Sequence, residues 1–145
     1  MKVDGRCHCG HITFEAEVDH DRVLLCHCSD CQTLSGTAFR VVAQSVPRTF
    51  RLLSGSPRIY RKTADSGQQR EQAFCPDCGT PIYSAPVAPE PRALGLRVGA
   101  LRQRAELVPR MQLWVRSAPG WLSDIGAIPS HETQPAFGAD GSFRK

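Results

Sequence analysis

Cys75-Pro76-Asp77-Cys78-Gly79 is the stretch that decides the fold of this 145-residue chain, because it has the form of a zinc-ribbon knuckle. A C-x-x-C turn lets two sulfur atoms reach one ion, and the glycine permits the tight backbone turn that follows. A structural zinc ion needs four ligands. The knuckle therefore predicts two further ligands elsewhere in the sequence.

Five more cysteines lie in two other groups, Cys7-His8-Cys9 and Cys26-His27-Cys28-Ser29-Asp30-Cys31. Three cysteines within six residues can face one ion without help from elsewhere. Assigning the second group to one zinc ion leaves the first group and the knuckle for another. This partition predicts a closed site of Cys7, Cys9, Cys75 and Cys78, and an open site of Cys26, Cys28 and Cys31. Closed zinc sites stabilise folds, whereas sites with an open position perform chemistry.

Other interpretations of the same cysteines stay open. Both ions can be purely structural, with His27, His8 or water completing the second site, or Cys26 and Cys31 can form a redox pair without metal. We expect His8, His11 and His27 to be surface or supporting groups rather than ligands. A zinc deaminase is excluded because the H-x-E or C-x-E element of those enzymes is missing from this sequence.

The open site favours sulfur chemistry. Three thiolates give the zinc unit a formal charge of −1, which makes it a weaker Lewis acid than zinc held by neutral histidines. It remains suited to capturing a further thiol as thiolate, which is a nucleophile at neutral pH without a protein base. The site therefore predicts the making or breaking of a carbon–sulfur bond. Arginines near it are expected to hold carboxylates of the thiol by bidentate hydrogen bonds.

Composition is that of one ordinary globular domain, with 41% hydrophobic and 22% charged residues. No stretch approaches the ~18 apolar residues of a membrane span. The segment from Met1 to Cys7 lacks the apolar run of a signal peptide, so we expect a cytoplasmic protein and no membrane partner. In a reducing compartment, an odd count of seven clustered cysteines indicates metal binding rather than disulfides.

The positive charge does not indicate a nucleic-acid partner. The formal net charge is +4, and it falls to +1 if seven thiolates bind two zinc ions. The arginines are scattered along the chain rather than clustered, and are expected to form a solvated surface: Arg48, Arg51, Arg58, Arg61, Arg92, Arg97, Arg102, Arg104 and Arg110. We expect no nucleic acid as a partner.

Hydrophobic periodicity predicts an all-β fold of short antiparallel strands. One short helical segment is expected over Ser29–Ser35, with Ser29 as its N-cap and Gly36 at its end. Residues 1–130 are expected to form the domain and residues 131–145 a partly flexible extension. Trp114 and Trp121 are expected to pack in the core rather than line a groove. The expected strands are His11–Val18, Val23–Leu25, Phe39–Ala43, Thr49–Leu53, Arg58–Arg61, Gln69–Phe74, Thr80–Ser84, Leu94–Leu101 and Met111–Arg116.

Three motifs together resemble the glutathione-dependent formaldehyde-activating enzyme family, which includes the centromere protein V relatives. They are Gly5-Arg6-Cys7-His8-Cys9-Gly10, then Cys26 to Cys31 followed by Ser35-Gly36, and Phe74-Cys75-Pro76-Asp77-Cys78-Gly79-Thr80. All seven cysteines match in order and spacing class. The likeness runs from about Lys2 to Ile128, including Leu113-Trp114-Val115-Arg116-Ser117 and Pro119-Gly120-Trp121-Leu122.

The resemblance implies a β-tent fold with two zinc ions, divided as above. Cys7, Cys9, Cys75 and Cys78 would be structural ligands, and Cys26, Cys28 and Cys31 would hold the catalytic zinc. The implied activity is that of a carbon–sulfur lyase interconverting S-hydroxymethylglutathione with glutathione and formaldehyde. No motif identifies a glutathione clamp. The alternative is a zinc-stapled, non-enzymatic module that binds a protein or nucleic acid.

Overall fold

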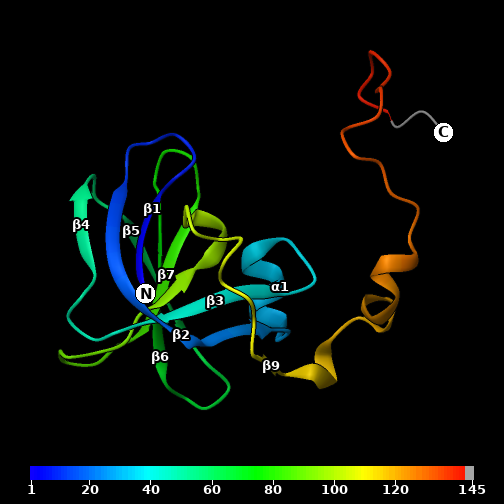
Figure 1. Ribbon diagram of the computed structural model, residues 1–145. Coiled ribbons are helices and arrows are strands. Elements are labelled where there is room, and N and C mark those ends of the chain that lie inside the picture. The colour runs from blue at the N-terminus through cyan, green and yellow to red at the C-terminus, as the bar shows by residue number, and fades with distance from the viewer. Residues whose placement is uncertain (143–145) are drawn as a thin grey trace.

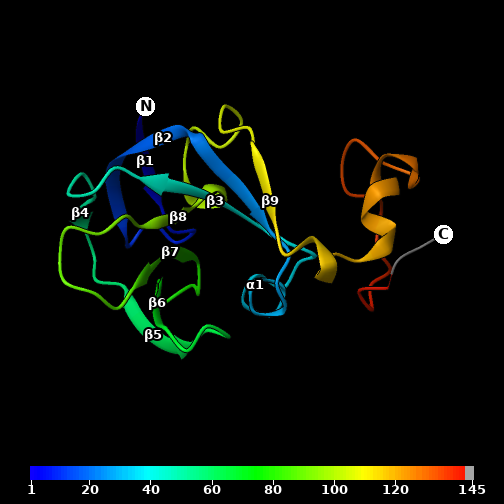
Figure 2. The same ribbon diagram turned by 90° about the horizontal axis from the view of Figure 1, so that it is seen from below.

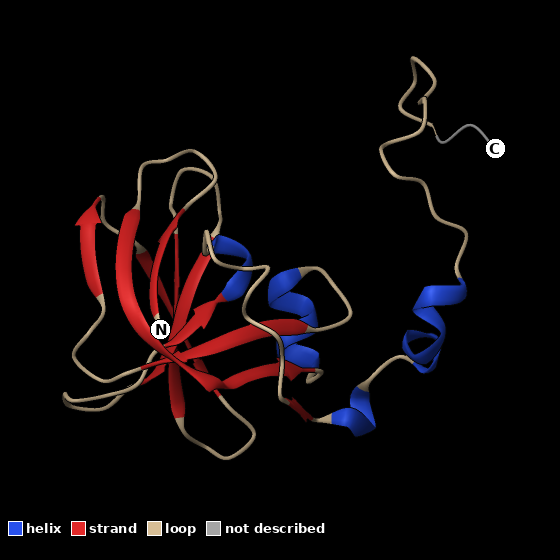
Figure 3. Ribbon diagram, in the orientation of Figure 1, coloured by secondary structure: helices blue, strands red, loops and turns tan. Residues whose placement is uncertain are grey.

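The computed structural model describes residues 1–142 and shows a mostly β protein with few helices (Figure 3). This confirms the all-β expectation. The strands are β1 (Lys2–Arg6), β2 (Thr13–Cys26), β3 (Arg40–Ser45), β4 (Arg51–Ser54), β5 (Arg58–Thr63), β6 (Gln69–Phe74), β7 (Pro81–Pro86), β8 (Gly95–Arg97) and β9 (Met111–Leu113). The one α-helix described, α1, spans Ser29–Ser35 as predicted.

The long strand β2 organises the sheet. Its first part pairs with β1 and β4, and its last part pairs with β3 and β9, with a register shift between Val18 and Val23. The two expected strands over residues 11–25 are therefore one bent strand. The strands were predicted to be antiparallel, but β9 runs parallel to β2. The main strand order is β1-β2-β3-β8-β7-β6-β5 (Figures 1 and 2).

The core lies against one face of this sheet. Phe14, Ile12, Ile82, Leu96 and Leu101 are fully buried. The rings of Phe14, Phe50 and Tyr83 form a row, with centroids 5.4 Å and 5.3 Å apart. Gly5 must lack a side chain, because a Cβ there would overlap the Phe14 ring and lie 2.8 Å from the carbonyl oxygen of Ala100. Close packing of this kind fixes the start of the chain beside the first cysteines.

Several segments differ from the sequence-based expectation. β1 was not predicted. It pairs with the first part of β2, which was predicted to be a strand. Val98–Ala100 (η1) and Val115–Ser117 (η2) are 3₁₀ turns at the ends of expected strands. The N-cap of α1 is Cys28 rather than Ser29, because the Cys28 sulfur accepts a hydrogen bond from the Cys31 amide. Gly36 ends the helix as predicted, with a left-handed φ of 67°.

Residues 118–142 run apart from the β domain in both views (Figures 1 and 2). They contain 3₁₀ structure, η3 (Gly120–Ala127), in a segment for which the sequence predicted no helix or strand. Of the predicted flexible extension over residues 131–145, residues 143–145 lie outside the described part of the chain. Among residues 1–142, no helix has the length and apolar character of a membrane span.

Candidate metal centre

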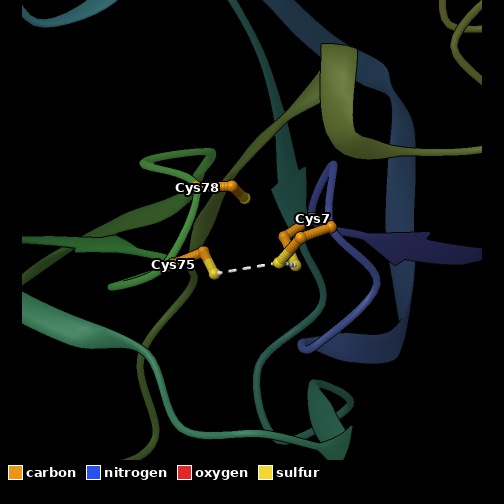
Figure 4. Close-up of side chains that lie close together, drawn as sticks. Cys7, Cys75 and Cys78 are labelled. Atoms are coloured by element: carbon orange, nitrogen blue, oxygen red, sulfur yellow. Dashed lines mark hydrogen bonds between the residues drawn. The ribbon is translucent and has the colours of Figure 1, made fainter.

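Cys7, Cys9, Cys75 and Cys78 come together from two ends of the sheet. Cys7 follows β1, and Cys75 and Cys78 lie on the turn between β6 and β7, with their side chains facing Cys7 (Figure 4). The four sulfur atoms lie within 4.8 Å of one another. The Cys7–Cys9 and Cys9–Cys75 sulfur distances are 3.5 Å and 3.8 Å. The turn is possible because Gly79 adopts a φ of 73°, as the knuckle predicted.

Hydrogen bonds to sulfur prepare this group for the thiolate state. The Ile12 amide donates to the Cys7 sulfur at 3.2 Å, and the Thr80 hydroxyl lies 3.1 Å from the Cys78 sulfur. The bond from Thr80 is the largest cause that lowers the pKa of Cys78 to about 5. Donors aimed at sulfur stabilise negative charge, which metal ligands must carry.

Cys26, Cys28 and Cys31 form the second group, at the end of β2 and the start of α1. Their sulfur atoms also lie within 4.8 Å of one another, and the Cys26–Cys28 distance is 3.5 Å. Helix α1 brings Cys31 back to the strand end because its first turn is capped by Cys28 itself. Among residues 1–142, no fourth histidine, cysteine or acidic side chain joins this group. Within the described residues it therefore presents three sulfur ligands and no fourth ligand of these types.

The three thiols are electrostatically unlike. The hydrogen bond from Cys31 lowers the pKa of Cys26 to about 5, and the positive charge of Arg97 acts in the same direction. The same Cys26 raises the pKa of Cys31. Cys26 is therefore deprotonated more easily than Cys31, and its thiolate favours capture of a cation.

His27 is a supporting group, as expected. Its ring is fully buried, its Nε2 lies 2.9 Å from Oε1 of Gln112 on β9, and it packs edge-on against Phe39. It does not belong to the cysteine group. His8 and His11 are exposed, and His11 faces Asp77 at 3.8 Å. None of the three histidines completes the second site.

The three-cysteine group opens into a cleft of about 690 Å³. Alternate residues of β3, β6, β7 and β8 form its floor, including Gln72, Ser84 and Arg97. This polar face lies opposite the core face of the same strands. A cleft of this volume is of the size that holds small-molecule ligands. The segment after β7, through Ala88, Pro89 and Pro91, forms a wall of the cleft.

Other residues singled out in the sequence have plain roles. The Ser35 hydroxyl donates to the Cys31 carbonyl oxygen at 2.6 Å, so it closes the helix end. Asp30 forms an ion pair with Lys62 of β5. The expectation that Trp114 and Trp121 pack in the core is wrong, because 42% and 53% of their surfaces are exposed. Trp114 instead lines the cleft, with the Arg116 guanidinium 4.9 Å above its ring.

The expected solvated arginine surface is also wrong for the cleft. Arg97 is only 7% exposed, and Arg92 is held at 3.0 Å by both Glu71 and Glu90. Arg40, which spacing did not single out, is 6% exposed. Their placement depends on which strands pair, so the linear sequence carried no signal for it.

Both cysteine groups fit a thiophilic metal ion. A tetrahedral ion with metal–sulfur bonds of about 2.3 Å requires sulfur atoms about 3.8 Å apart, and the separations here agree. Soft thiolate ligands in sets of four and three are typical of zinc rather than of magnesium or calcium. The chain is thus a small all-β domain with two cysteine sites suited to metal.

Comparison with known proteins identifies the family of this domain. The sequence model of the glutathione-dependent formaldehyde-activating enzyme family matches residues 2–117, and the chain belongs to that family. The fold is also similar to the crystal structure of a Rhodobacter sphaeroides protein from a structural genomics programme. That match has a TM-score of 0.59 and 21% identity, and covers 76% of this chain and 99% of the other.

Proposed function

We propose that this protein is a zinc-dependent carbon–sulfur lyase that interconverts a small thiol and formaldehyde with the S-hydroxymethyl adduct. Glutathione is the first thiol to test, because the family carries that name. The observation that supports the reaction is the group of Cys26, Cys28 and Cys31, which has no fourth protein ligand among residues 1–142 and lines a cleft. We place the enzyme in the reducing cytosol, where these thiols persist.

The two cysteine groups have different roles in this proposal. Cys7, Cys9, Cys75 and Cys78 hold a structural zinc ion that joins β1 to the β6–β7 turn. Cys26, Cys28 and Cys31 hold a second ion. A zinc ion with three thiolate ligands supplies a position at which a substrate thiol is bound as its nucleophilic thiolate.

The reaction needs no oxidant or reductant. The thiol loses its proton to solvent, and its sulfur attacks the formaldehyde carbon. The carbon–sulfur bond forms as the carbonyl π bond breaks, and the oxygen takes a proton from water. The reverse direction breaks the same bond. Holding both reactants in one cleft makes the step effectively unimolecular.

The residues of the cleft bind and orient the substrate. Arg70 lines it and forms no ion pair within the described chain, so it is available for a substrate carboxylate. Lys62 is already paired with Asp30. Trp114 provides an apolar wall beside the cysteines. This arrangement suits a thiol that carries acidic groups.

The test is the exchange rate between glutathione and S-hydroxymethylglutathione, measured by NMR exchange spectroscopy with and without protein. We expect acceleration by the zinc-loaded protein and none by Cys28→Ser, which removes a proposed ligand. Arg110→Met, at an exposed position before β9, is a matched control that should retain the activity. If no thiol among glutathione, cysteine and 2-mercaptoethanol exchanges faster with protein, the reaction is wrong and a zinc-stapled binding module becomes the better interpretation.

A further inference from the structure

Two arginines are buried near the three-cysteine group without an acidic partner. Arg40 and Arg97 are 6% and 7% exposed. Arg97 donates to Oε1 of Gln72 at 2.7 Å, but within residues 1–142 neither guanidinium forms an ion pair. Nη2 of Arg40 and Nε of Arg97 also have no hydrogen-bond partner in this part of the chain. A buried cation without a counter-charge is costly, so such groups normally face an anion.

Strand register places both arginines on the face that carries Cys26. Arg40 of β3 is the direct cross-strand partner of Cys26 on β2. Arg97 of β8 is the cross-strand partner of Val42, two residues along β3 from Arg40. Because side chains alternate along a strand and paired residues share a face, Cys26, Arg40 and Arg97 point to the same side of the sheet.

The electrostatics agree with this placement. Burial lowers the pKa of Arg40, and it lowers that of Arg97 to about 9 with a further contribution from the charge of Arg40. The thiolates of Cys26 and Cys31 act in the opposite direction on both arginines. The cations repel each other and are attracted to the cysteine group. That group is therefore the anion that they face.

Counting charges changes the character of the open position. Three thiolates and a divalent ion carry −1, which disfavours a fourth ligand that is itself an anion. The two buried guanidinium groups alone bring the local charge to +1, so that an anionic fourth ligand is attracted and brings it to zero. Arg70, which lines the cleft, adds charge of the same sign. This count rests on the metal-binding part of the proposed function.

We propose that Arg40 and Arg97 make the open position of the three-cysteine site selective for an anionic ligand, a thiolate in preference to a neutral donor. They act as selectivity-determining residues through their charge, without contributing a ligand. Arg92, which lines the cleft together with Arg97, cannot serve this purpose because Glu71 and Glu90 already balance its charge.

The experiment uses the full chain with cobalt(II) in the three-cysteine site, identified by the part of the visible spectrum that Cys28→Ser loses. Two probes are titrated: 2-mercaptoethanol, which binds as a thiolate, and imidazole, which binds as a neutral donor. Arg40→Met and Arg97→Met each remove one charge and keep an apolar chain. Arg40→Lys keeps the charge, and Arg110→Met removes an equal charge from an exposed loop position.

We expect each buried Met variant to weaken 2-mercaptoethanol binding roughly tenfold, the effect of one charge within about 12 Å at an effective dielectric constant of about 20. Imidazole binding should change less than about twofold by the same reasoning. Arg40→Lys should restore most of the thiol affinity, and Arg110→Met should match the parent protein.

Equal losses of affinity for both probes would show that the arginines are merely structural and would overturn the inference. Unchanged affinities for both probes would overturn it as well. If the Met variants do not fold, Arg40→Gln and Arg97→Gln replace them under the same criterion. Absence of cobalt from the three-cysteine site in the parent protein would overturn the proposed function and this inference together. Bound cobalt with unaltered selectivity would overturn only the inference.

Discussion

Thr80 supports the four-cysteine group through one hydroxyl with two contacts. It lies 3.1 Å from the Cys78 sulfur and accepts a hydrogen bond from the His8 amide at 3.0 Å. Thr80→Val keeps the shape and removes both bonds. We expect the variant to release its structural metal at a higher pH than the parent, because the Cys78 thiolate is then protonated more easily.

The sign of this effect follows from the pKa of Cys78, which the fold lowers from 9.0 to about 5. A thiol whose folded pKa is lowered contributes stability that is fully present above pH 9 and is lost as the pH falls toward 5. Acid titration with a metal-sensitive dye measures the release. Thr80→Ser retains the hydroxyl and should titrate like the parent, and a Val variant that did so too would contradict this role.

Individual residues differ in how far the sequence reveals them. The partition of the seven cysteines was predictable because ligand spacing is local: Cys28 and Cys31 share a helical turn, and Cys75 and Cys78 share a knuckle. Arg40 and Arg97 are 57 residues apart and become neighbours only through the pairing of β3 with β8. Their burial was therefore not predictable from composition.

At the scale of elements, β9 holds the end of β2 in place beside the three-cysteine group. Its Leu113 carbonyl accepts from the His27 amide at 3.0 Å, and its Gln112 bonds the buried His27 ring. Gln112→Leu leaves both ring nitrogens without a partner, since Nδ1 has none within residues 1–142. We expect a loss of about 1–3 kcal/mol in the free energy of unfolding, measured with urea.

The same variant should bind metal less tightly at the three-cysteine site, because His27 lies between Cys26 and Cys28 in the chain. Gln112→Glu is the matched comparison, since a carboxylate also accepts from the ring and should retain most of the stability. An unchanged urea midpoint in Gln112→Leu would show that β9 does not hold β2 through this bond.

Local patterns predicted the elements that depend on nearby residues. Helix α1 and strand β6 have the predicted bounds, because Gly36 ends the helix and the Cys75 knuckle directly follows the strand. β1 and β9 were less predictable, since short strands acquire their structure from the partner that they pair with. The cleft was also less predictable from the sequence, because its floor is made of alternate residues from four strands.

At the scale of the whole molecule, we propose that residues 131–145 lie outside the folded unit. The family match ends at residue 117, and residues 118–142 run apart from the β domain (Figure 1). Deletion of residues 131–145 should change the free energy of unfolding by less than about 0.5 kcal/mol and leave metal content unaltered. A marked loss of stability in urea unfolding would place the segment within the domain.

The two cysteine groups should respond differently when one ligand is removed. Cys78 belongs to a group that joins the N-terminal segment to the β6–β7 turn, with Cys7 and Cys75 fully buried. Cys28→Ser affects only a strand end and the first turn of α1. We expect anaerobically prepared parent protein to hold two zinc ions per chain, Cys28→Ser to hold one and stay folded, and Cys78→Ser to unfold.

Metal analysis and circular dichroism on the same samples measure both properties. The difference arises because the four-cysteine group crosslinks segments about 70 residues apart, so its loss frees a long loop, whereas the three-cysteine group spans only six residues of chain. Equal unfolding of the two variants would mean that both groups are structural. A folded Cys78→Ser protein with one ion would instead assign the structural role to Cys26, Cys28 and Cys31.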